Sequence, residues 1–504
     1  MKASSHSRNR TGPTLRRAGF ALALASAFVL GQSAAWAEDP MAAAMPGKPD
    51  FPYGTYDLGT QGYVMKEFSV SGMAVSYGPA GKAGAGGIVP AKPEGSAAYK
   101  TRVVVITPAD PAKFNGTVVV EWLNVSGGLD VPVDFIMLHR ELLRGGYAYV
   151  GVSAQQVGVD GGPRSISGNA DPLKKADPAR YGTLVHPGDA YSFDIFSDAA
   201  RLLKSQPATL LGPLKPKRIL AVGQSQSAIY LATYVNEVDP LVRVYDGFLL
   251  HSRAGYAAPL DGTSMYHESL AQLQTPTKLN PNPRVPVLQL ATETDLIGLG
   301  AVAGLYPVQQ PDSPHLRTWE IAGAAHVDNY ELGTGMIDIP QLPVAKLAAA
   351  WAPKTSVLGI TLPVPVNNGP QHHYVAEAAL VRLDEWVAGG QAPPAAGRIT
   401  LQLDTKGGLA GGIRTPWVDV PVSHLTGFPA GVLGSAAIAG AAIPYDQAAL
   451  AQFYPGGKTE YLRKFRAALD KTIQSGFILP ADREEILDLA RLSYPPGAPP
   501  AASP

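Results

Sequence analysis

The feature that most constrains this fold is a turn between two apolar segments. The stretch KRILAVGQSQSAIYLATYV places Gly223 and Ser225 between a strand-like run and a helix-like run. This pattern is typical of a nucleophile elbow, in which a sharp strand-to-helix turn exposes one serine hydroxyl above a sheet. Small residues two positions before and after the serine let the strand and the helix approach closely. Ser227 stands where the second glycine is usual, so the elbow has to accommodate a hydroxymethyl group.

A simpler interpretation of the same residues is a helix N-cap, with the Ser225 side chain accepting backbone amide protons. The preceding strand pattern and the apolar helix that follows favour the elbow. In an elbow the first helical amide, here that of Gln226, has no partner within the helix and points at the same place as the hydroxyl. We therefore expect Ser225 to be a nucleophile and the Gln226 amide to belong to an oxyanion hole.

The segments around this turn alternate between strand and helix patterns. Such alternation predicts a mainly parallel central sheet with helices on both faces, here with a β-rich N-terminal lead-in and a C-terminal extension. Strand patterns lie at 64–77, 99–106, 117–125, 147–154, 218–223, 243–250, 285–291 and 316–322, with a strand-rich stretch at 398–421, and helix patterns lie at 133–143, 189–203, 226–235, 375–387, 459–475 and 482–493.

The first 37 residues have the pattern of an export signal. Four arginines precede an uncharged apolar run from Ala18 to Leu30, and Ala35 and Ala37 offer small residues at a cleavage site. That run is shorter than the roughly 20 residues needed to span a bilayer, so we expect cleavage without a lasting membrane anchor. The predicted location is periplasmic or secreted. The pair Arg16-Arg17 leaves the general and the twin-arginine export routes both open.

The remaining chain is expected to form one domain over 38–490. Stretches rich in glycine and proline predict insertions near 158–188 and 252–284. The segment 491–504 is predicted to be disordered, because its prolines cannot continue a helix and little of it can be buried.

The composition excludes several classes of function. Lys plus Arg and Asp plus Glu number 41 each, so there is no basic excess that would attract nucleic acid. Cysteine is absent, which excludes thiol catalysis, thiolate metal sites and disulfide bonds. The expected partner is a small molecule, and the oligomeric state stays open.

A serine nucleophile requires a base and a carboxylate, which follow it in this order in elbow-containing folds. His326 follows the last strand pattern and three small residues, and is the predicted base. The stretch VPVLQLATETD offers Asp295 and Glu293 after the preceding strand. Asp295 lies further into the loop and is the preferred acid, with Glu293 as the alternative.

The second oxyanion donor should come from the loop after the strand pattern at 117–125. The stretch EWLNVSGG places the amides of Asn124 and Val125 there, and either one can serve. Glu121, in the same strand, would need a buried partner.

Adjacent His372 and His373 invite a comparison with metal sites. A metal site needs three or four convergent ligands, and no metal-binding spacing surrounds this pair. We expect a capping or pocket-lining role instead, with no metal and no cofactor.

Several blocks together resemble a family of exported bacterial proteins called alpha/beta hydrolase domain. The blocks are TPADPAKFNGTVVVEWLNVSGG, YVGVSAQQVGV, GQSQSA, ATETDL, WEIAGAAH and NNGPQHHYVAEAALVRLDEWVAGGQAPP, and they extend over nearly the whole mature chain. The resemblance implies an α/β-hydrolase fold with Ser225 as nucleophile, His326 as base and Asp295 or Glu293 as acid. It implies little about substrate.

The sequence therefore predicts an exported serine esterase that cleaves a carboxylic ester or a lactone through an acyl-enzyme. The two insertions would form the rim of the site, and their Tyr and Leu residues favour a partly apolar substrate. Amide cleavage, acyl transfer and a cofactor-free lyase reaction are alternatives on the same fold. A non-catalytic periplasmic binding protein that keeps the elbow only as a turn is a further alternative.

Overall fold

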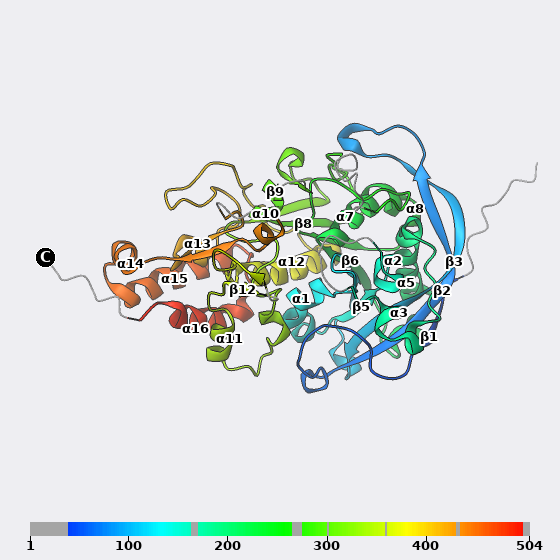
Figure 1. Ribbon diagram of the computed structural model, residues 1–504, viewed down its shortest axis with the longest axis horizontal. Coiled ribbons are helices and arrows are strands. Elements are labelled where there is room, and N and C mark those ends of the chain that lie inside the picture. Colours follow the sequence, from blue (N-terminus) through cyan, green and yellow to red (C-terminus); the bar gives the residue numbers. More distant parts are fainter. Residues whose placement is uncertain are drawn as a thin grey trace, which may run out of the picture. The chain divides into compact units, whose positions relative to one another are not determined.

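The structure, a computed structural model, describes residues 39–162, 170–264, 275–299, 302–357, 360–429 and 434–496. The predicted signal peptide lies outside these residues. A nine-stranded sheet in the order β1-β2-β3-β5-β4-β6-β7-β8-β11 forms the centre (Figure 1). Its strands are β1 Met41–Ala44, β2 Tyr63–Pro79, β3 Ala91–Pro108, β4 Thr117–Trp122, β5 Ala148–Val152, β6 Arg218–Gln224, β7 Gly247–His251, β8 Val287–Thr292 and β11 Leu316–Ile321.

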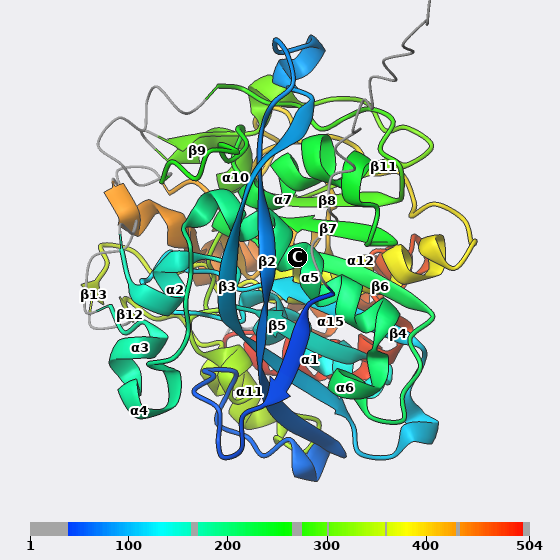
Figure 2. The same cartoon turned by 90° about the vertical axis from the view of Figure 1, so that its right-hand side faces the viewer.

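The sheet is parallel from β5 to β11 and antiparallel from β1 to β3, which confirms the predicted parallel core with a β-rich lead-in. Strands β2 and β3 form one long hairpin that crosses the other strands (Figure 2). Both exceed their predicted lengths. The first half of β3, AKPEGSAA, carries no strand pattern of its own and is extended because it pairs with β2.

Helices cover both faces of the sheet, as the alternation predicted. Strand β4 alternates its valines between two apolar clusters, with Val119 in one and Val118 and Val120 in the other. Helices α1 (Val133–Arg144) and α12 (Gln371–Val387) pack in the first cluster. Helices α5 (Ser192–Ser205) and α7 (Gln226–Thr233) pack in the second. Burial on both faces explains why the central strands read as continuous apolar runs.

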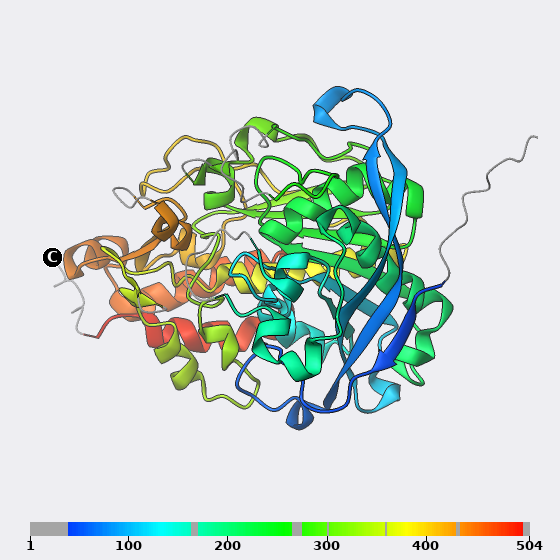
Figure 3. The ribbon, with the colours of Figure 1, turned by 45° about the vertical axis from the view of Figure 1, so that its right-hand side comes forward.

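The remaining elements are short, or belong to the C-terminal part. That part and the long hairpin lie on opposite sides of the domain (Figure 3). These elements are α2 Gln156–Asp160, α3 Leu173–Ala176, α4 Pro178–Tyr181, α6 Pro207–Leu211, α8 Asp239–Val242, α10 Glu293–Ile297, α11 Val344–Ala350, α13 Pro416–Asp419, α14 Gln447–Phe453, α15 Gly457–Gln474, α16 Arg483–Ser493, β9 Gly298–Leu299, β10 Val302–Ala303, β12 Ser356–Val357, β13 Ile360–Thr361, β14 Ser423–Thr426 and β15 Ala441–Pro444. None of the described helices is long and apolar enough to cross a membrane.

Three predicted boundaries are wrong for local reasons. The stretch 398–421 contains α13 and isolated bridges rather than strands, because Gly407, Gly411 and Gly412 adopt positive φ angles that interrupt an extended chain. Strand β7 begins at Gly247 instead of 243, since Arg243 ends α8 in a left-handed conformation. Helix α12 begins at Gln371, four residues before the prediction, so that His372 and His373 lie inside it.

The predicted insertions and tail are described only in part. In the first insertion, α2, α3 and α4 pack around a small apolar cluster of their own, and residues 163–169 lie outside the described residues. In the second, residues 265–274 lie outside. The predicted disordered tail is wrong at its start, because α16 continues to Ser493 and Tyr494 is buried. Residues 497–504 lie outside the described part.

Other parts of the chain occupy some hydrogen-bonding groups along both edges of the sheet. Strand β1 pairs only with residues 68–71 of β2. Further along β2, the amide of Val75 donates to Asp194 Oδ2 of α5 at 2.7 Å. On the opposite outer strand, β11, Ile321 bridges to Ile413, and Arg398 donates to the carbonyl of Thr318 at 2.6 Å. Side chains and loops thus occupy hydrogen-bonding groups at both edges.

Candidate active site

Ser225 lies between β6 and α7 in a conformation that L-residues rarely adopt, with φ 61° and ψ −120°. Its backbone amide donates to the carbonyl of His251 at 2.8 Å, which fixes the turn against β7. A Cβ atom at Gly223 would lie 2.9 Å from Cβ of Ser227, closer than the strand and helix allow. The glycine is therefore required on the strand side. Ser227 is accommodated on the helix side, fully buried.

Two of the predicted partners converge on Ser225. His326, in the loop after β11, places Nε2 2.8 Å from Ser225 Oγ and Nδ1 2.5 Å from Asp295 Oδ1. Asp295 lies in α10, directly after β8. A carboxylate can only accept, so His326 carries its proton on Nδ1 and its Nε2 accepts from the serine hydroxyl.

Asp295 is held in place by the start of α10. Its second oxygen accepts from the amide and the hydroxyl of Thr292 at 2.7 and 2.9 Å. Burial acts to raise the pKa of Asp295, but His326 and the Thr292 donors outweigh burial, and the pKa lies below its ordinary value. The site therefore keeps Asp295 ionised next to the imidazole.

Glu293, the alternative acid, faces away from His326. Its carboxylate accepts from the amides of Gly323 and Gly427 at 2.7 and 2.9 Å. Burial raises its pKa. Glu293 thus connects the loop before His326 to a C-terminal segment. Among the described residues it makes no hydrogen bond to the His326 imidazole.

The two loop amides predicted as oxyanion donors have different hydrogen-bond partners. The amide of Asn124 donates to the carbonyl of Val131 at 3.0 Å in an isolated β-bridge, so the structure contradicts its predicted role. The Asn124 side chain instead donates to the carbonyl of Gln224 at 3.1 Å. The amide of Val125 faces α7 and makes only a long hydrogen bond, 3.4 Å, to Oε1 of Gln226. Of the two loop amides, that of Val125 is therefore the one that stays compatible with the predicted role.

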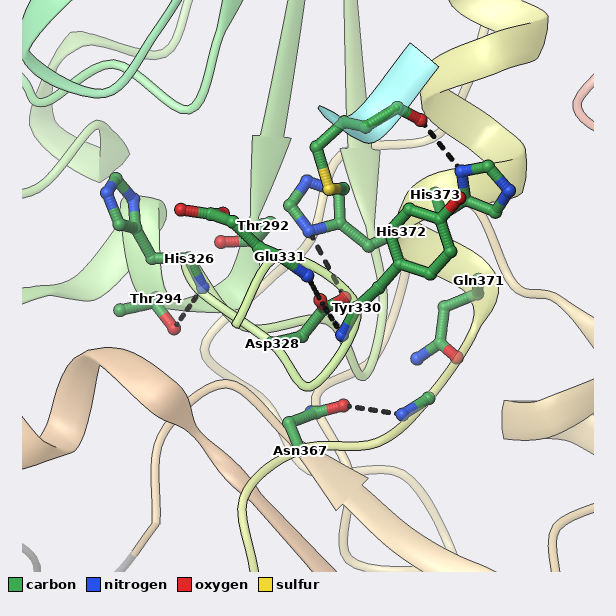
Figure 4. A network of polar contacts seen from close by, with 12 residues as sticks. Thr292, Thr294, His326, Asp328, Tyr330, Glu331, Asn367, Gln371, His372 and His373 are labelled. Carbon is green, nitrogen blue, oxygen red and sulfur yellow. Dashed lines mark hydrogen bonds and ion pairs between the residues drawn. The ribbon is translucent and has the colours of Figure 1, made fainter. Parts of the chain in front are cut away.

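Sequence reasoning missed two acids beside the site. Gln224 places its side-chain nitrogen 3.5 Å from both the carbonyl of His326 and Oε2 of Glu331. Burial, together with the charges of Asp328 and other acids, raises the pKa of Glu331 well above its usual value. Asp328 accepts from the amides of Tyr330 and Glu331 and shapes the loop that carries His326 (Figure 4). The only signal was the proximity of these residues to His326 in the sequence.

The structure contradicts the capping or pocket-lining role that the sequence predicts for His372 and His373. Both are buried inside the first turn of α12. His373 Nδ1 lies 2.7 Å from the carbonyl of Met137, while His372 is directed at Asp328 (Figure 4). The Nε2 atom of His372 lies 2.7 Å from Nε2 of His251. Among the described residues, no three His, Cys, Asp or Glu side chains are arranged to hold a metal ion.

Glu121 has the buried partners that it was expected to need. Its two oxygens accept from the amides of Asp134 and Phe135, both at 2.9 Å, and from the hydroxyl of Tyr149 at 2.7 Å. Since those amides open α1, the carboxylate binds the unsatisfied donors of a helix N-terminus. Glu121 thereby fixes α1 under the carboxyl ends of the central strands.

A family model described as an alpha/beta hydrolase domain matches residues 36–488. Solved structures similar to the chain include an esterase of Pyrococcus furiosus, with 11% identity over 54% of this chain and 86% of that chain and a TM-score of 0.27. A thermostable esterase of Pseudomonas putida shares 12% identity over 59% of this chain and 82% of that chain, with a TM-score of 0.30. No curated protein matches.

At such low TM-scores these likenesses carry no argument about chemistry. The family match stands by itself, because it extends from before β1 into α16 and includes the elbow, α10 and the His326 loop. The parallel sheet and the strand-turn-helix around Ser225 agree with it. The chain therefore belongs to the alpha/beta hydrolase domain family.

Proposed function

We propose that this protein is a serine hydrolase that cleaves carboxylic esters, lactones included, through an acyl-enzyme. The observation that carries the proposal is one continuous contact, from Ser225 Oγ to His326 Nε2 at 2.8 Å and from His326 Nδ1 to Asp295 at 2.5 Å. This is the arrangement in which a weakly nucleophilic hydroxyl acquires a base and the base acquires an orienting carboxylate.

In the first half-reaction Ser225 Oγ attacks the carbonyl carbon while its proton passes to His326 Nε2. The imidazolium then gives this proton to the leaving alcohol, and the C–O bond of the ester breaks to leave an acyl-serine. In the second half-reaction His326 takes a proton from water and the hydroxide attacks the acyl carbon. The C–Oγ bond of the acyl-serine then breaks, the carboxylic acid leaves, and the proton returns from His326 to Ser225 Oγ. Asp295 stays ionised throughout and stabilises the imidazolium.

The amides of Gln226 and Val125 receive the oxyanion. Each such donor lowers the barrier by about 3 kcal/mol. In the resting enzyme the Gln226 side chain accepts from Val125 at 3.4 Å, a long and therefore weak hydrogen bond that a substrate oxygen can replace. Asn124 supports the same loop through its bridge to Val131 and its bond to the carbonyl of Gln224.

The site acts without a cofactor in this proposal, on a small and partly apolar ester. In this proposal its rim includes the described parts of the two insertions, which are 158–162 with 170–188 and 252–264 with 275–284. The signal pattern of residues 1–37 directs the protein to the periplasm or the medium, where it encounters its substrate. Fractionation of cells that carry the full-length gene tests this location, with a variant whose Arg16 and Arg17 are replaced by glutamine as the control.

A fluorophosphonate probe tests the chemistry. It should label the purified protein, and Ser225→Ala should abolish labelling without unfolding the protein. A folded wild-type protein that resists the probe would favour a binding protein that keeps the elbow as a turn. A panel of p-nitrophenyl esters of increasing chain length, with aryl esters, lactones and matched anilides, then separates ester cleavage from amide cleavage. Product analysis with an added alcohol detects acyl transfer.

A further inference from the structure

Four buried titratable groups that the proposed reaction does not use form a chain beside the site. His251 Nδ1 lies 2.8 Å from Asp134 Oδ1, and His251 Nε2 lies 2.7 Å from His372 Nε2. His372 Nδ1 lies 3.6 Å from Asp328 Oδ2. The side chains are 0–1% exposed, so water does not substitute for these contacts. The chain thus links α1, β7, α12 and the His326 loop. Figure 4 shows the end of the chain that His372 and Asp328 form.

The contact between the imidazoles restricts the protons. Two nitrogens 2.7 Å apart need one proton between them, because two would clash and none would oppose two lone pairs. The contact between His251 Nδ1 and Asp134 Oδ1, at 2.8 Å, needs one proton for the same reason. At the far end, His372 Nδ1 and Asp328 Oδ2 lie 3.6 Å apart, beyond hydrogen-bond distance, and neither has a hydrogen-bond partner among the described residues. One proton between them stabilises this pair electrostatically. Three contacts therefore hold three protons, and the four groups together carry one negative charge.

Two orders satisfy this count. In one, Asp134 is the neutral acid and donates to His251, His251 donates through Nε2 to His372, and His372 donates through Nδ1 to ionised Asp328. In the other, every donor and acceptor is reversed, and the charge sits on Asp134. The hydrogen bonds around the two carboxyl groups distinguish them.

The negative charge is better stabilised on Asp328 than on Asp134. Its Oδ1 accepts from two backbone amides, those of Tyr330 at 2.8 Å and Glu331 at 3.1 Å. Asp134 Oδ2 and Asp328 Oδ2 are both buried without a hydrogen-bond partner among the described residues, but Asp328 has two backbone amides on its other oxygen and Asp134 has only an imidazole nitrogen. A negative charge therefore costs more on Asp134 than on Asp328. Glu121, bound to the first amides of α1, already places a carboxylate beside Asp134.

The titration behaviour of the buried groups agrees with this order. Burial raises the pKa of Asp134 to about 8 and raises that of Glu121 as well, to which the charge of Asp134 adds. Burial also lowers the pKa of His251 to about 4 and lowers that of His372. Both imidazoles are therefore neutral at pH 7. Other groups facing the chain are Asp295, His326 and Glu331, from α10 and the His326 loop.

We propose that Asp134, His251, His372 and Asp328 form one proton-ordered chain that holds its negative charge at Asp328 and so positions the loop carrying His326. His251 and His372 are positioning residues, since neither contacts Ser225 through its side chain. His251 also anchors the elbow directly, because its carbonyl accepts the amide of Ser225. The effect of the chain on turnover rests on the proposed function, whereas its proton order does not.

The proton order is tested on the unmodified protein. Long-range ¹H–¹⁵N spectra of protein labelled with ¹⁵N-histidine distinguish the two tautomers, with His251→Gln and His372→Gln used for assignment. We expect His251 to be protonated only on Nε2 and His372 only on Nδ1, with both unchanged between pH 5.5 and 7.5. The opposite tautomers, or a cationic signal from either ring, would overturn the proposal.

Asparagine variants test the consequence. In Asp134→Asn the amide still donates to His251, so we expect kcat/KM within about twofold of wild type and an unshifted pH profile. In Asp328→Asn the new amide donor faces the donor on His372 and the chain must reverse. Removing the charge beside the His326 loop destabilises its imidazolium. We therefore expect kcat to fall at least tenfold with KM little changed, and the acid limb of the profile to move to lower pH.

The double variant separates order from simple packing. In Asp328→Asn the reversed order puts the negative charge on buried Asp134, whereas in the double variant the new amide at position 134 turns its oxygen to His251 and accepts without a charge. The double variant should therefore be more stable in urea unfolding than Asp328→Asn alone. Additive losses, or a damaging Asp134→Asn, would refute the proposal, because separated sites without coupling add. If the wild-type protein hydrolyses no ester, the proposed function fails. The tautomers, and the same cycle in urea unfolding, would then still decide the proton order.

Discussion

The strained backbone of Ser225 leads to a prediction about stability that is independent of activity. A non-glycine residue at φ 61° and ψ −120° lies outside the regions that a Cβ atom tolerates. Ser225→Ala keeps the Cβ atom and its strain, whereas Ser225→Gly removes both. Each variant loses the Oγ–His326 hydrogen bond, so their comparison cancels that contribution. We expect the glycine variant to be the more stable of the two.

The size of the difference follows from three contributions. Residues held in such regions cost about 1–3 kcal/mol. Glycine loses about 0.5–1 kcal/mol relative to alanine through the greater freedom of the unfolded chain. The methyl group that it gives up is half-buried, so this loss is smaller than the about 0.8 kcal/mol of a fully buried CH₂ group. A net gain of about 1 kcal/mol in the free energy of unfolding remains.

Equilibrium unfolding in urea measures this gain, because in a domain of this size 1 kcal/mol moves Tm by only about 1 °C. Ala112→Gly is the matched control, at an exposed position without positive φ, and should lose about 0.5–1 kcal/mol. The replacement of alanine by glycine thus stabilises at one position and destabilises at the other. The same sign at both positions would show that the elbow stores no strain. Neither Ser225 variant should hydrolyse esters.

Three other variants test the site and its surroundings. In an ester assay Asp295→Asn should lower kcat by about 10³–10⁴-fold, since nothing then fixes the tautomer of the His326 imidazole. Folded Glu293→Gln should keep most of its turnover, and the reverse ranking would assign the role of the acid to Glu293. Gly223→Ala should destabilise by about 1–3 kcal/mol in urea, because the added methyl group meets Ser227, and Ser227→Gly in the same chain should recover part of this. Burial raises the pKa of Glu237 from 4.5 to about 7, so its contribution to stability is complete below pH 4.5 and is lost as the pH rises through 7. Glu237→Gln should therefore match wild type near pH 4.5 and exceed it at pH 8 by up to about 3 kcal/mol, and a pH-independent difference would contradict the burial of this acid.

The residues that converge at the elbow were predictable because each follows the end of a strand. Parallel strands bring their carboxyl ends to one edge, so a strand count was enough to place Asp295 and His326 near Ser225. The choice between Asn124 and Val125 could not be made in this way. It depends on which of two neighbouring amides the bridge to Val131 occupies, and only the folded loop decides that.

The buried chain of four titratable residues could not be predicted from the sequence, for a different reason. Asp134, His251, His372 and Asp328 come from four separate elements, and in the sequence none has a partner at a recognisable spacing. The predicted strand-rich stretch at 398–421 is wrong because three glycines in it adopt positive φ angles, which a strand pattern does not reveal. Helix α12 was placed too late because its first turn consists of polar residues that pack inside the domain instead of facing solvent.

The contacts along the edges of the sheet affect how copies of this protein can associate. A strand that is open along its length is a template to which a second molecule can add its own strand, the usual first step toward aggregates. Here an arriving strand would find the Val75 amide already bound to Asp194, and the far edge bridged to Ile413. A second molecule could add a strand at these positions of β2 and β11 only by breaking these contacts.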